Sequence, residues 1–298
     1  MELAIGGKTL RNPVGVASGT FGYGSEYEEL IDLSKVGALF AKSVSVSSRH
    51  GNEVPRLVET PAGLLNSIGL ANVGIERYIS EKLPFFETLP CPVVSNVAGS
   101  NEDEFADLVG LLEQKPGVWG FEINLSCPNV EHGLAYGTDP KSVETLTGRL
   151  RAITTKPLII KLTPNVTDIG EIARAAEAGG ADALSCINTV IGMVIDIEAK
   201  KPVLPAGTGG LSGPAIRPVG VAAVYRVART VKVPVFGIGG ILEPSDAIQY
   251  LLAGASAVQV GTGNFVDPSL VERVAAGIAE YAQRENIKSI TDFHSFID

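Results

Sequence analysis

The sequence has no long apolar run and no cluster of basic residues, and each absence argues against a class of protein. No stretch reaches the roughly 18 apolar residues of a membrane span, and the N-terminus MELAIGGKTLRNP lacks a basic segment followed by an apolar run. The formal net charge of −9 has the wrong sign for neutralising the phosphates of a nucleic acid. We therefore expect a soluble, cytoplasmic protein that binds neither membrane nor nucleic acid.

Cysteine and histidine are scarce. The three cysteines, Cys91, Cys127 and Cys186, lie far apart in the sequence without any C-x-x-C spacing, which indicates neither a disulfide framework nor a metal or iron–sulfur site within this chain. The three histidines lie in polar segments or near the C-terminus, and no metal-ligand or Ser-His-Asp spacing stands out. Any iron–sulfur chemistry would need another chain.

What the sequence does contain is a regular alternation of short β-branched runs with segments of helical periodicity. The alternation predicts repeated βα units around a parallel sheet. An open doubly wound sheet usually carries its glycine-rich loop after the first strand, whereas here the glycine pairs follow the seventh and eighth. A (β/α)8 barrel is therefore favoured, with strands at Val14–Ala17, Leu39–Lys42, Val93–Asn96, Phe121–Asn124, Leu158–Lys161, Ala183–Ile187, Val235–Gly237 and Ala257–Val260.

The segments between and before the strands complete this prediction. The N-terminal LAIGGKTLRNP is typical of a hairpin that closes the barrel bottom. Residues 43–83 and 189–218 exceed ordinary βα loops, so we expect both insertions to cover an active site at the C-terminal face. Glycine is predicted to end three helices in the left-handed conformation, at Gly37, at the pair Gly179-Gly180 and at Gly254. No linker or break in composition divides the chain, which predicts one domain over 1–298.

Six polar residues fall at or just beyond strand ends, where a (β/α)8 barrel places its active site. Each taken alone is equally explained by barrel-end hydrogen bonding or turn formation, but their convergence favours a site. Lysines at an apolar barrel mouth need an anionic partner, such as a reduced flavin or a carboxylated substrate, unless they reach out to solvent at the rim. The six are Ser18, Lys42, Asn96, Asn124, Lys161 and Asn188.

Glycines and asparagines indicate what the site binds. Gly239-Gly240 and Gly261-Thr262 follow the last two strands, where bare backbone N–H groups frequently bind phosphate, although both are also ordinary turn sequences. An asparagine offers a donor and an acceptor, which suits the alternating edge of a pyrimidine ring. The four asparagines in question are Asn66, Asn124, Asn129 and Asn188. Turn formation is the alternative explanation, above all for Asn66 and Asn129.

Cys127 is the candidate proton-handling residue. It follows the fourth strand by three residues and precedes Pro128, in a segment that cannot continue as helix or strand. An accessible thiolate can act as a general base, even though the unperturbed pKa of a cysteine thiol is about 8.5. Cys91 and Cys186 are interpreted as small buried hydrophobes.

Together these motifs resemble those of the class 1 dihydroorotate dehydrogenases, in which a cysteine is the catalytic base. The similarity covers nearly the whole chain, on ASGTFGYG (17–24), AKSVS (41–45), NSIGLAN (66–72), INLSCPN (123–129), KLTPN (161–165), INT (187–189), GGLSGPAIRP (209–218), GIGGI (237–241) and VGTG (260–263). The resemblance implies FMN binding by Ser18, Lys42, Ser43, Asn96, Asn124, Lys161, Ile187, Gly213, Gly239, Gly240, Gly261 and Thr262. It implies dihydroorotate or orotate binding by Lys42, Asn66, Ser67, Ile68, Gly69, Leu70, Asn124, Asn129, Asn188 and Thr189.

The resemblance also implies a reaction. Cys127 would remove the C5 proton of dihydroorotate while C6 delivers hydride to flavin N5, and Lys161 would stabilise the anionic reduced flavin. The product, orotate, belongs to pyrimidine (UMP) biosynthesis.

The segments GTFGYG and AYGTDP are similar to class 1B, whose partner subunit carries FAD and a [2Fe–2S] cluster and passes electrons to NAD+. A heterotetramer of two catalytic and two electron-transfer chains is then expected. The alternatives are the class 1A homodimer that reduces fumarate, another flavin barrel such as a dihydrouridine synthase, and a flavin-binding subunit without catalysis.

Overall fold

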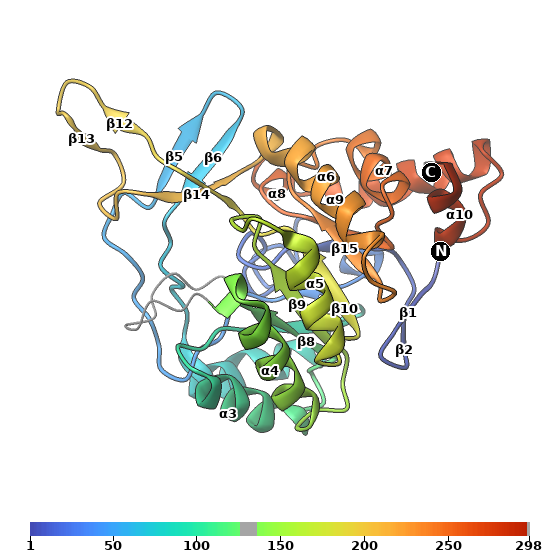
Figure 1. Cartoon of the computed structure of the whole chain (residues 1–298), viewed down its shortest axis with the longest axis horizontal. Helices are drawn as coiled ribbons and strands as arrows, with labels where there is room; N and C mark the ends of the chain where they lie inside the picture. Colours follow the sequence, from blue (N-terminus) through green and yellow to red (C-terminus); the bar gives the residue numbers. More distant parts are fainter. Residues whose placement is uncertain (126–135, 297–298) are drawn as a thin grey trace.

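The structure, a computed structural model, describes residues 1–125 and 136–296. Eight parallel strands close into a barrel and helices surround it, which confirms the predicted (β/α)8 architecture (Figure 1). The strands are rich in β-branched and leucine residues because a parallel barrel strand is buried on both faces. In barrel order they are β3 (Val14–Val16), β4 (Leu39–Phe40), β7 (Val93–Val97), β8 (Gly120–Asn124), β9 (Leu158–Leu162), β10 (Ala183–Cys186), β15 (Val235–Ile238) and β16 (Ala257–Val260).

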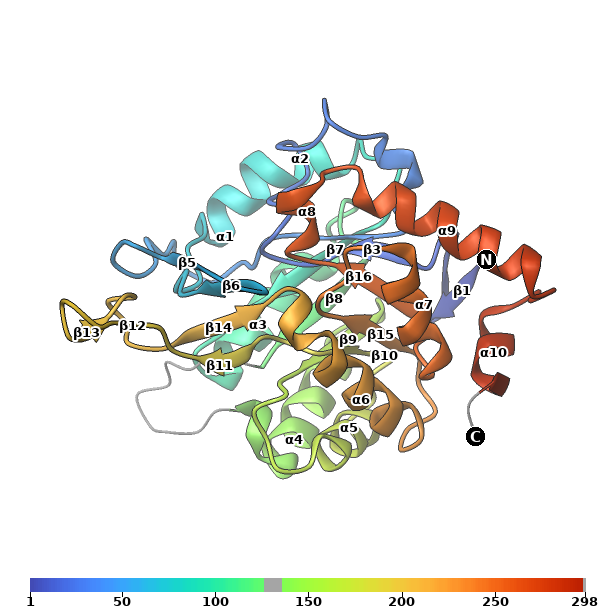
Figure 2. The ribbon, with the colours of Figure 1, turned by 90° about the horizontal axis from the view of Figure 1, so that it is seen from above.

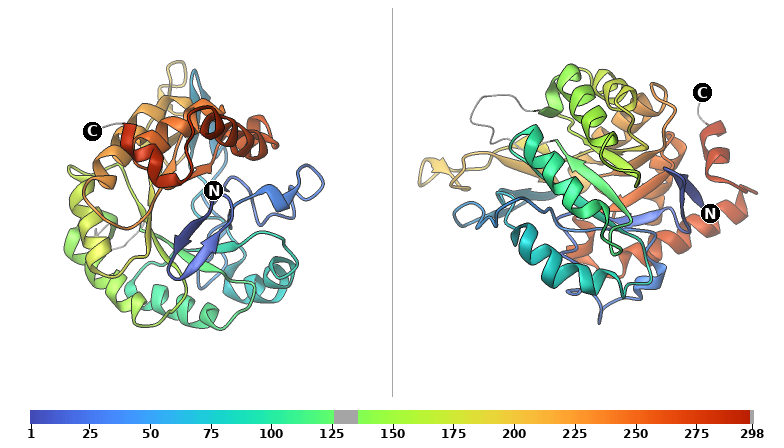
Figure 3. Two further views of the ribbon diagram at one scale, coloured as in Figure 1. Left: turned by 90° about the vertical axis from the view of Figure 1, so that its right-hand side faces the viewer. Right: turned by 90° about the horizontal axis from the view of Figure 1, so that it is seen from below.

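An N-terminal hairpin covers the bottom of the barrel, as predicted. Strands β1 (Leu3–Ile5) and β2 (Lys8–Leu10) pair antiparallel with Ile5 opposite Lys8. Ile5 and Leu10 are buried in one apolar cluster with Phe40 and Phe236 from the barrel strands. Figure 3 shows the hairpin lying across this end of the ring of helices. The hairpin therefore seals one end of the barrel and leaves the opposite end for a site.

The longer outer helices bury apolar residues against the barrel, and several of them begin at polar caps. Asn101 accepts a hydrogen bond from the Glu104 N–H at 2.9 Å and starts α3, and Asp139 accepts one from the Ser142 N–H at 2.8 Å and starts α4. The longer helices are α3 (Glu102–Glu113), α4 (Pro140–Arg151), α5 (Ile169–Ala178), α6 (Arg217–Ala228), α7 (Pro244–Leu252) and α9 (Leu270–Arg284). Shorter ones are α1 (Gly74–Arg77), α2 (Leu83–Phe86), α8 (Gly263–Val266) and α10 (Ile290–Phe293), with a π-helical turn at Tyr78–Lys82 and 3-10 turns at Leu33–Lys35, Tyr136–Thr138, Pro214–Ile216 and His294–Phe296.

Two of the three predicted left-handed glycines are confirmed. Gly180 has a φ of +94° and Gly254 a φ of +112°. The prediction for Gly37 is wrong, because its φ is not positive. A Cβ there would lie 2.0 Å from the Asn12 carbonyl oxygen, so the glycine is required by close backbone approach. It follows a single 3-10 turn and not an α-helix.

The two long insertions fold together into a small antiparallel sheet beyond the barrel. Its strand order is β11 (Val190–Gly192), β14 (Gly209–Ser212), β6 (Gly63–Asn66) and β5 (Leu57–Thr60). A second pair, β12 (Ile195–Asp196) and β13 (Lys201–Pro202), extends from it. Figure 2 shows this sheet at the opposite end of the molecule from β1. The expected cover over the C-terminal face is thus a sheet built from both insertions.

None of the helices in the described part of the chain is long and apolar enough to cross a membrane.

Candidate active site

A buried carboxylate inside the barrel connects five strands. Glu122 on β8 is fully buried and accepts hydrogen bonds from the Asn96 side-chain amide and the Ser185 hydroxyl, both at 2.6 Å. The Gln259 amide donates to it at 3.3 Å, and the Lys161 ammonium lies 3.5 Å away. These donors come from β7, β10, β16 and β9, so the network spans the barrel interior. It brings two of the predicted site residues, Asn96 and Lys161, to one carboxylate.

Glu122 was not identified as a site residue from the sequence, although the alternation of residues along its strand could have indicated it. Gly120, Glu122 and Asn124 alternate with Phe121 and Ile123, and alternate residues of a strand point to the same side. Because Asn124 was assigned to the barrel mouth, the carboxylate two residues earlier had to point into the barrel as well. A strand that buries one charged residue among apolar ones is a candidate for such a network.

The other polar residues predicted at the strand ends gather around this network. The Ser43 hydroxyl donates to the Asn96 side-chain oxygen, and the Ser18 hydroxyl donates to the Ala41 carbonyl at 2.8 Å. Lys42, which follows Ala41, is half-buried. In residues 1–125 and 136–296, no carboxylate oxygen lies within 4.0 Å of its ammonium. Lys42 is thus available to an anionic ligand.

The predicted phosphate glycines bring together, in one cradle, backbone N–H groups that are mostly buried: Gly213 and Gly240 are buried and Gly239 is half-buried. Gly213, Gly239 and Gly240 have φ angles of +90°, +125° and +67°. Their N–H groups donate to no acceptor in the described residues. A Cβ on Gly240 would lie 2.7 Å from the Gly213 carbonyl oxygen, so the two loops touch. Concave arrangements of successive free N–H groups bind phosphate.

The third part of this cradle is the loop after β16. The Thr262 hydroxyl donates to the Ser212 hydroxyl at 2.7 Å, which joins the start of α8 to the end of β14. Gly261 precedes Thr262, and a Cβ there would touch the Ala17 side chain at 3.7 Å. The loops after β14, β15 and β16 therefore meet at one place. Because β15 and β16 are the seventh and eighth strands of the barrel, this is where a (β/α)8 barrel frequently binds phosphate.

Two buried side chains that the sequence analysis did not single out hold the loop after β15. The Tyr250 hydroxyl donates to the carbonyls of Gly239 at 2.7 Å and Ile238 at 3.2 Å, and burial raises the pKa of this phenol. Asp246 accepts from the N–H groups of Leu242 at 2.9 Å and Glu243 at 3.0 Å, and it also pairs with the Arg217 guanidinium. Two side chains of α7 therefore hold the backbone of the loop after β15 in place.

Four of the predicted substrate residues, Asn66, Asn124, Asn188 and Thr189, lie in one contiguous group. The Asn188 amide donates to the Asn124 side-chain oxygen at 3.4 Å, and the Asn188 oxygen accepts from the Thr189 N–H at 2.8 Å. A Cβ on Gly210 would lie 2.1 Å from the Thr189 hydroxyl and 3.3 Å from the Asn66 amide, so Asn66 adjoins this pair. The accessory sheet thus brings residues of both insertions to the ends of β8 and β10.

The segment after Asn66 runs away from this group along the 49–56 loop. The Ser67 hydroxyl accepts from the Asn52 amide at 2.6 Å, and the Ile68 carbonyl accepts from the Asn52 N–H at 3.2 Å. Gly69 and Leu70 both have positive φ, +68° and +54°. Two successive left-handed residues make a tight turn, which is unusual for leucine.

Two of the three cysteines, Cys91 and Cys186, lie in the described part of the chain. Cys91 and Cys186 are buried, and burial raises the pKa of the Cys91 thiol to about 11 and raises that of Cys186 further. This confirms their interpretation as buried thiols. Cys127 and Asn129 lie outside the described residues. Ile187, predicted to contact the flavin, is buried and donates its N–H to the Ile238 carbonyl at 3.3 Å.

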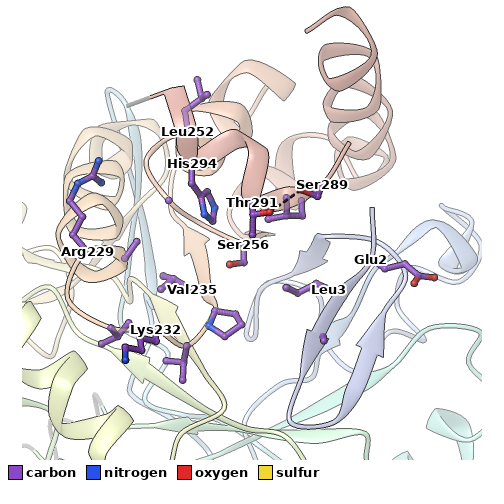
Figure 4. A pocket seen from close by; sticks show the side chains of 17 residues that line it. Glu2, Leu3, Arg229, Lys232, Val235, Leu252, Ser256, Ser289, Thr291 and His294 are labelled. Carbon is purple, nitrogen blue, oxygen red and sulfur yellow. Dashed lines mark hydrogen bonds between the residues drawn. The ribbon is translucent and has the colours of Figure 1, made fainter. Parts of the chain in front are cut away.

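A hollow of about 570 Å³ lies at the other end of the barrel (Figure 4). Leu3 of the hairpin, Val235 at the start of β15, and His294 line it. His294 is engaged there by the Ala255 carbonyl at 3.0 Å. None of the described residues predicted for the site lines this hollow, and it opens at the N-terminal ends of the strands. It is therefore separate from the candidate site.

The fold and this geometry define a (β/α)8 barrel that has, at its C-terminal face, a cluster of backbone N–H groups suited to binding phosphate and a buried lysine. Comparison with known sequences specifies the family. The family described as Dihydroorotate dehydrogenase matches residues 1–281, and the chain belongs to it.

Among curated relatives, proteins of Geotalea daltonii and Trichlorobacter lovleyi are 50% and 51% identical over 293 and 292 residues. One from Geobacter sulfurreducens is 48% identical over 293 residues. Each alignment covers 98% of this chain and 96% of the relative. All three relatives are named dihydroorotate dehydrogenase B (NAD(+)), catalytic subunit.

Proposed function

We propose that this chain oxidises (S)-dihydroorotate to orotate, in pyrimidine (UMP) biosynthesis, as a catalytic subunit of the NAD+-linked type. The observation that carries the proposal is the placement of Lys161, Asn124 and Asn188 at the same barrel end as three glycine N–H donors without partners. This arrangement suits a phosphate-bearing cofactor beside a small planar substrate. The family and the names of its relatives support the same reaction.

The residues present fit FMN. Gly213, Gly239 and Gly240, with Gly261 and Thr262, would bind the phosphate, because the N–H groups of the first three have no acceptor in the described residues. A Cβ on Gly213 or Gly240 would clash with the neighbouring segment, so only glycine allows this backbone arrangement. The ring would lie toward Ser18, Lys42, Ser43, Asn96, Asn124, Lys161 and Ile187. When bound, FMN supplies the two-electron acceptor for the hydride on substrate C6.

The chain's own residues would bind the substrate and move the proton. Asn124 and Asn188 each present an amide at the mouth, which can donate to ring carbonyls and accept from ring N–H groups. Asn66, Ser67, Ile68, Gly69, Leu70, Asn129 and Thr189 complete the proposed substrate site. Lys42 and Lys161 would balance the negative charge of the substrate carboxylate and of the reduced cofactor. Cys127 would take the C5 proton, a role that needs its thiolate.

We further propose that the electrons leave through a partner subunit carrying FAD and a [2Fe–2S] cluster, in a heterotetramer of two chains of each kind. The name shared by the relatives, a catalytic subunit of an NAD+-linked enzyme, supports this acceptor. Fumarate reduction by a homodimer is the competing route, and a subunit without catalysis is the third possibility.

Anaerobic mixing separates these three functions. The purified FMN-loaded chain is mixed with dihydroorotate and flavin absorbance is followed, and fumarate or NAD+ is then added. We expect rapid bleaching that neither acceptor reverses quickly on the lone chain, with NAD+ becoming effective once the partner subunit is present. Rapid reoxidation by fumarate would contradict the NAD+-linked assignment. An absence of bleaching would contradict catalysis altogether.

A further inference from the structure

The mechanism proposed above does not use Glu122, although Glu122 is the most completely enclosed charge near the site. A buried carboxylate is unfavourable unless hydrogen bonds and an opposite charge compensate it. Asn96, Ser185 and Gln259 supply neutral donors, and Lys161 supplies the only opposite charge within 4.0 Å in the described residues. Four donors on one carboxylate indicate that this part of the barrel is built around a negative charge.

Strand register places Glu122 deeper in the barrel than the level of Lys161 and Asn124. In the β8–β9 pair Asn124 lies opposite Lys161, and Glu122 lies two residues earlier, opposite Ile159. Glu122 is therefore one inward-pointing step deeper than Asn124, which contacts Asn188 at the mouth. The Lys161 ammonium lies 3.5 Å from the Glu122 carboxylate, and the lysine is only 6% exposed. Its charge is thus shared between the carboxylate below and a ligand above.

We propose that Glu122 is a positioning residue that acts on the bound flavin through Lys161. It fixes the ammonium at the mouth and offsets part of its charge, so that it holds the reduction potential of FMN below the value that Lys161 alone would set. An unbalanced ammonium beside the cofactor would stabilise the anionic reduced flavin more strongly. Electrons that enter from the substrate must also leave, and a lower potential favours their departure. This inference rests on the proposed FMN site.

The test is Glu122→Gln in the FMN-loaded protein, with the midpoint potential of the flavin measured at pH 7 by equilibration with reference dyes. Glutamine keeps the size and one acceptor oxygen. Its new NH₂ group can be accommodated, because the Gln259 side-chain oxygen is buried without a partner and can rotate to accept from it. We expect the preference for reduced over oxidised FMN to rise about tenfold, which is about +30 mV for a two-electron couple.

The matched control is Ser185→Ala, which removes a neutral donor from the same carboxylate and leaves the charges in place. A purely structural role would give both variants similar effects on FMN affinity and no directed change in potential. The charge-balancing role predicts a rise for Glu122→Gln and a change of less than threefold in the redox preference for Ser185→Ala. If Glu122→Gln does not accumulate as a folded protein, Glu122→Gln/Ser185→Ala removes the hydroxyl donor that would face the new NH₂ group and keeps the Gln259 acceptor, and the same rise is expected.

An unchanged or lower potential in the folded glutamine variant would overturn the inference. That outcome would leave the proposed function intact, provided that wild-type FMN is still bleached by dihydroorotate. Failure of the wild-type protein to bind FMN or to be bleached would instead contradict the proposed function. The two failures are therefore distinguishable in one set of samples.

Discussion

Tyr250→Phe is the sharpest test of how the phosphate cradle is held. The substitution removes one hydroxyl that donates to the carbonyls of Gly239 and Ile238, at 2.7 and 3.2 Å, and leaves the buried ring in place. One proton serves both carbonyls, so the loss counts as a single strong hydrogen bond with two poorly satisfied acceptors. We expect the free energy of unfolding to fall by about 1–2 kcal/mol.

This change can be measured in two ways. For a chain of this size it corresponds to a decrease in melting temperature of roughly 1.5–3 °C, measured on the protein without FMN. If about half of the loss also loosens the loop that binds phosphate, FMN affinity should fall roughly two- to fivefold by fluorescence titration. Tyr281→Phe is the control, since it makes the same chemical change on α9, where the ring stacks on Phe293 and its hydroxyl has no partner in the described residues.

The outcomes separate support of the loop from stability alone. A lower melting temperature with unchanged FMN affinity would mean that Tyr250 stabilises α7 and the barrel but not the cradle. No effect on either measurement would refute the assigned hydrogen bonds.

Three further predictions concern the thiols, the cradle and its support. Thiol titration of the native protein at pH 8 should find one fast-reacting cysteine that disappears in Cys127→Ser, because burial raises the pKa values of Cys91 and Cys186; two or more fast thiols would contradict this. Gly240→Ala should weaken FMN binding at least tenfold by titration, because alanine disfavours a φ of +67° and its Cβ would meet the Gly213 carbonyl oxygen at 2.7 Å; unchanged affinity would exclude this cradle. Asp246→Ala should lower the free energy of unfolding by about 2–4 kcal/mol in denaturant titrations, since two N–H groups and a guanidinium lose their acceptor, and a loss below about 1 kcal/mol would contradict it.

The barrel was predictable because its signals are local. Runs such as Val93–Val97 and Leu158–Leu162 are short, mostly apolar segments rich in valine, isoleucine and leucine with one or two polar residues, and glycines mark the turns that follow the last strands. The prediction at Gly37 failed because it used only local signals. This glycine is required by the close approach of the Asn12 carbonyl, which belongs to a different segment. A contact between segments leaves no periodic trace in either one.

The accessory sheet and the interior network were not predictable for that reason. The pairing of Asn66 with Gly210 joins residues 144 positions apart, in strands of four residues each. The partners of Glu122 lie on four other strands, so its role can be recognised only once the barrel has formed. The roles of the individual site residues, the single-domain organisation and the base role of Cys127 stay predictions, the last for a residue outside the described part of the chain.

Single-turnover reduction of bound FMN by dihydroorotate, compared between Cys127→Ala and Cys91→Ala, tests the central claim most directly. Both variants remove one thiol, but Cys91 is buried away from the mouth with its pKa raised to about 11. We predict that both proteins bind FMN, that Cys91→Ala reduces it at nearly the wild-type rate, and that Cys127→Ala is slower by about 10²- to 10⁴-fold, the range typical of a general base. Equal rates in the two variants would contradict the assignment of proton removal to Cys127.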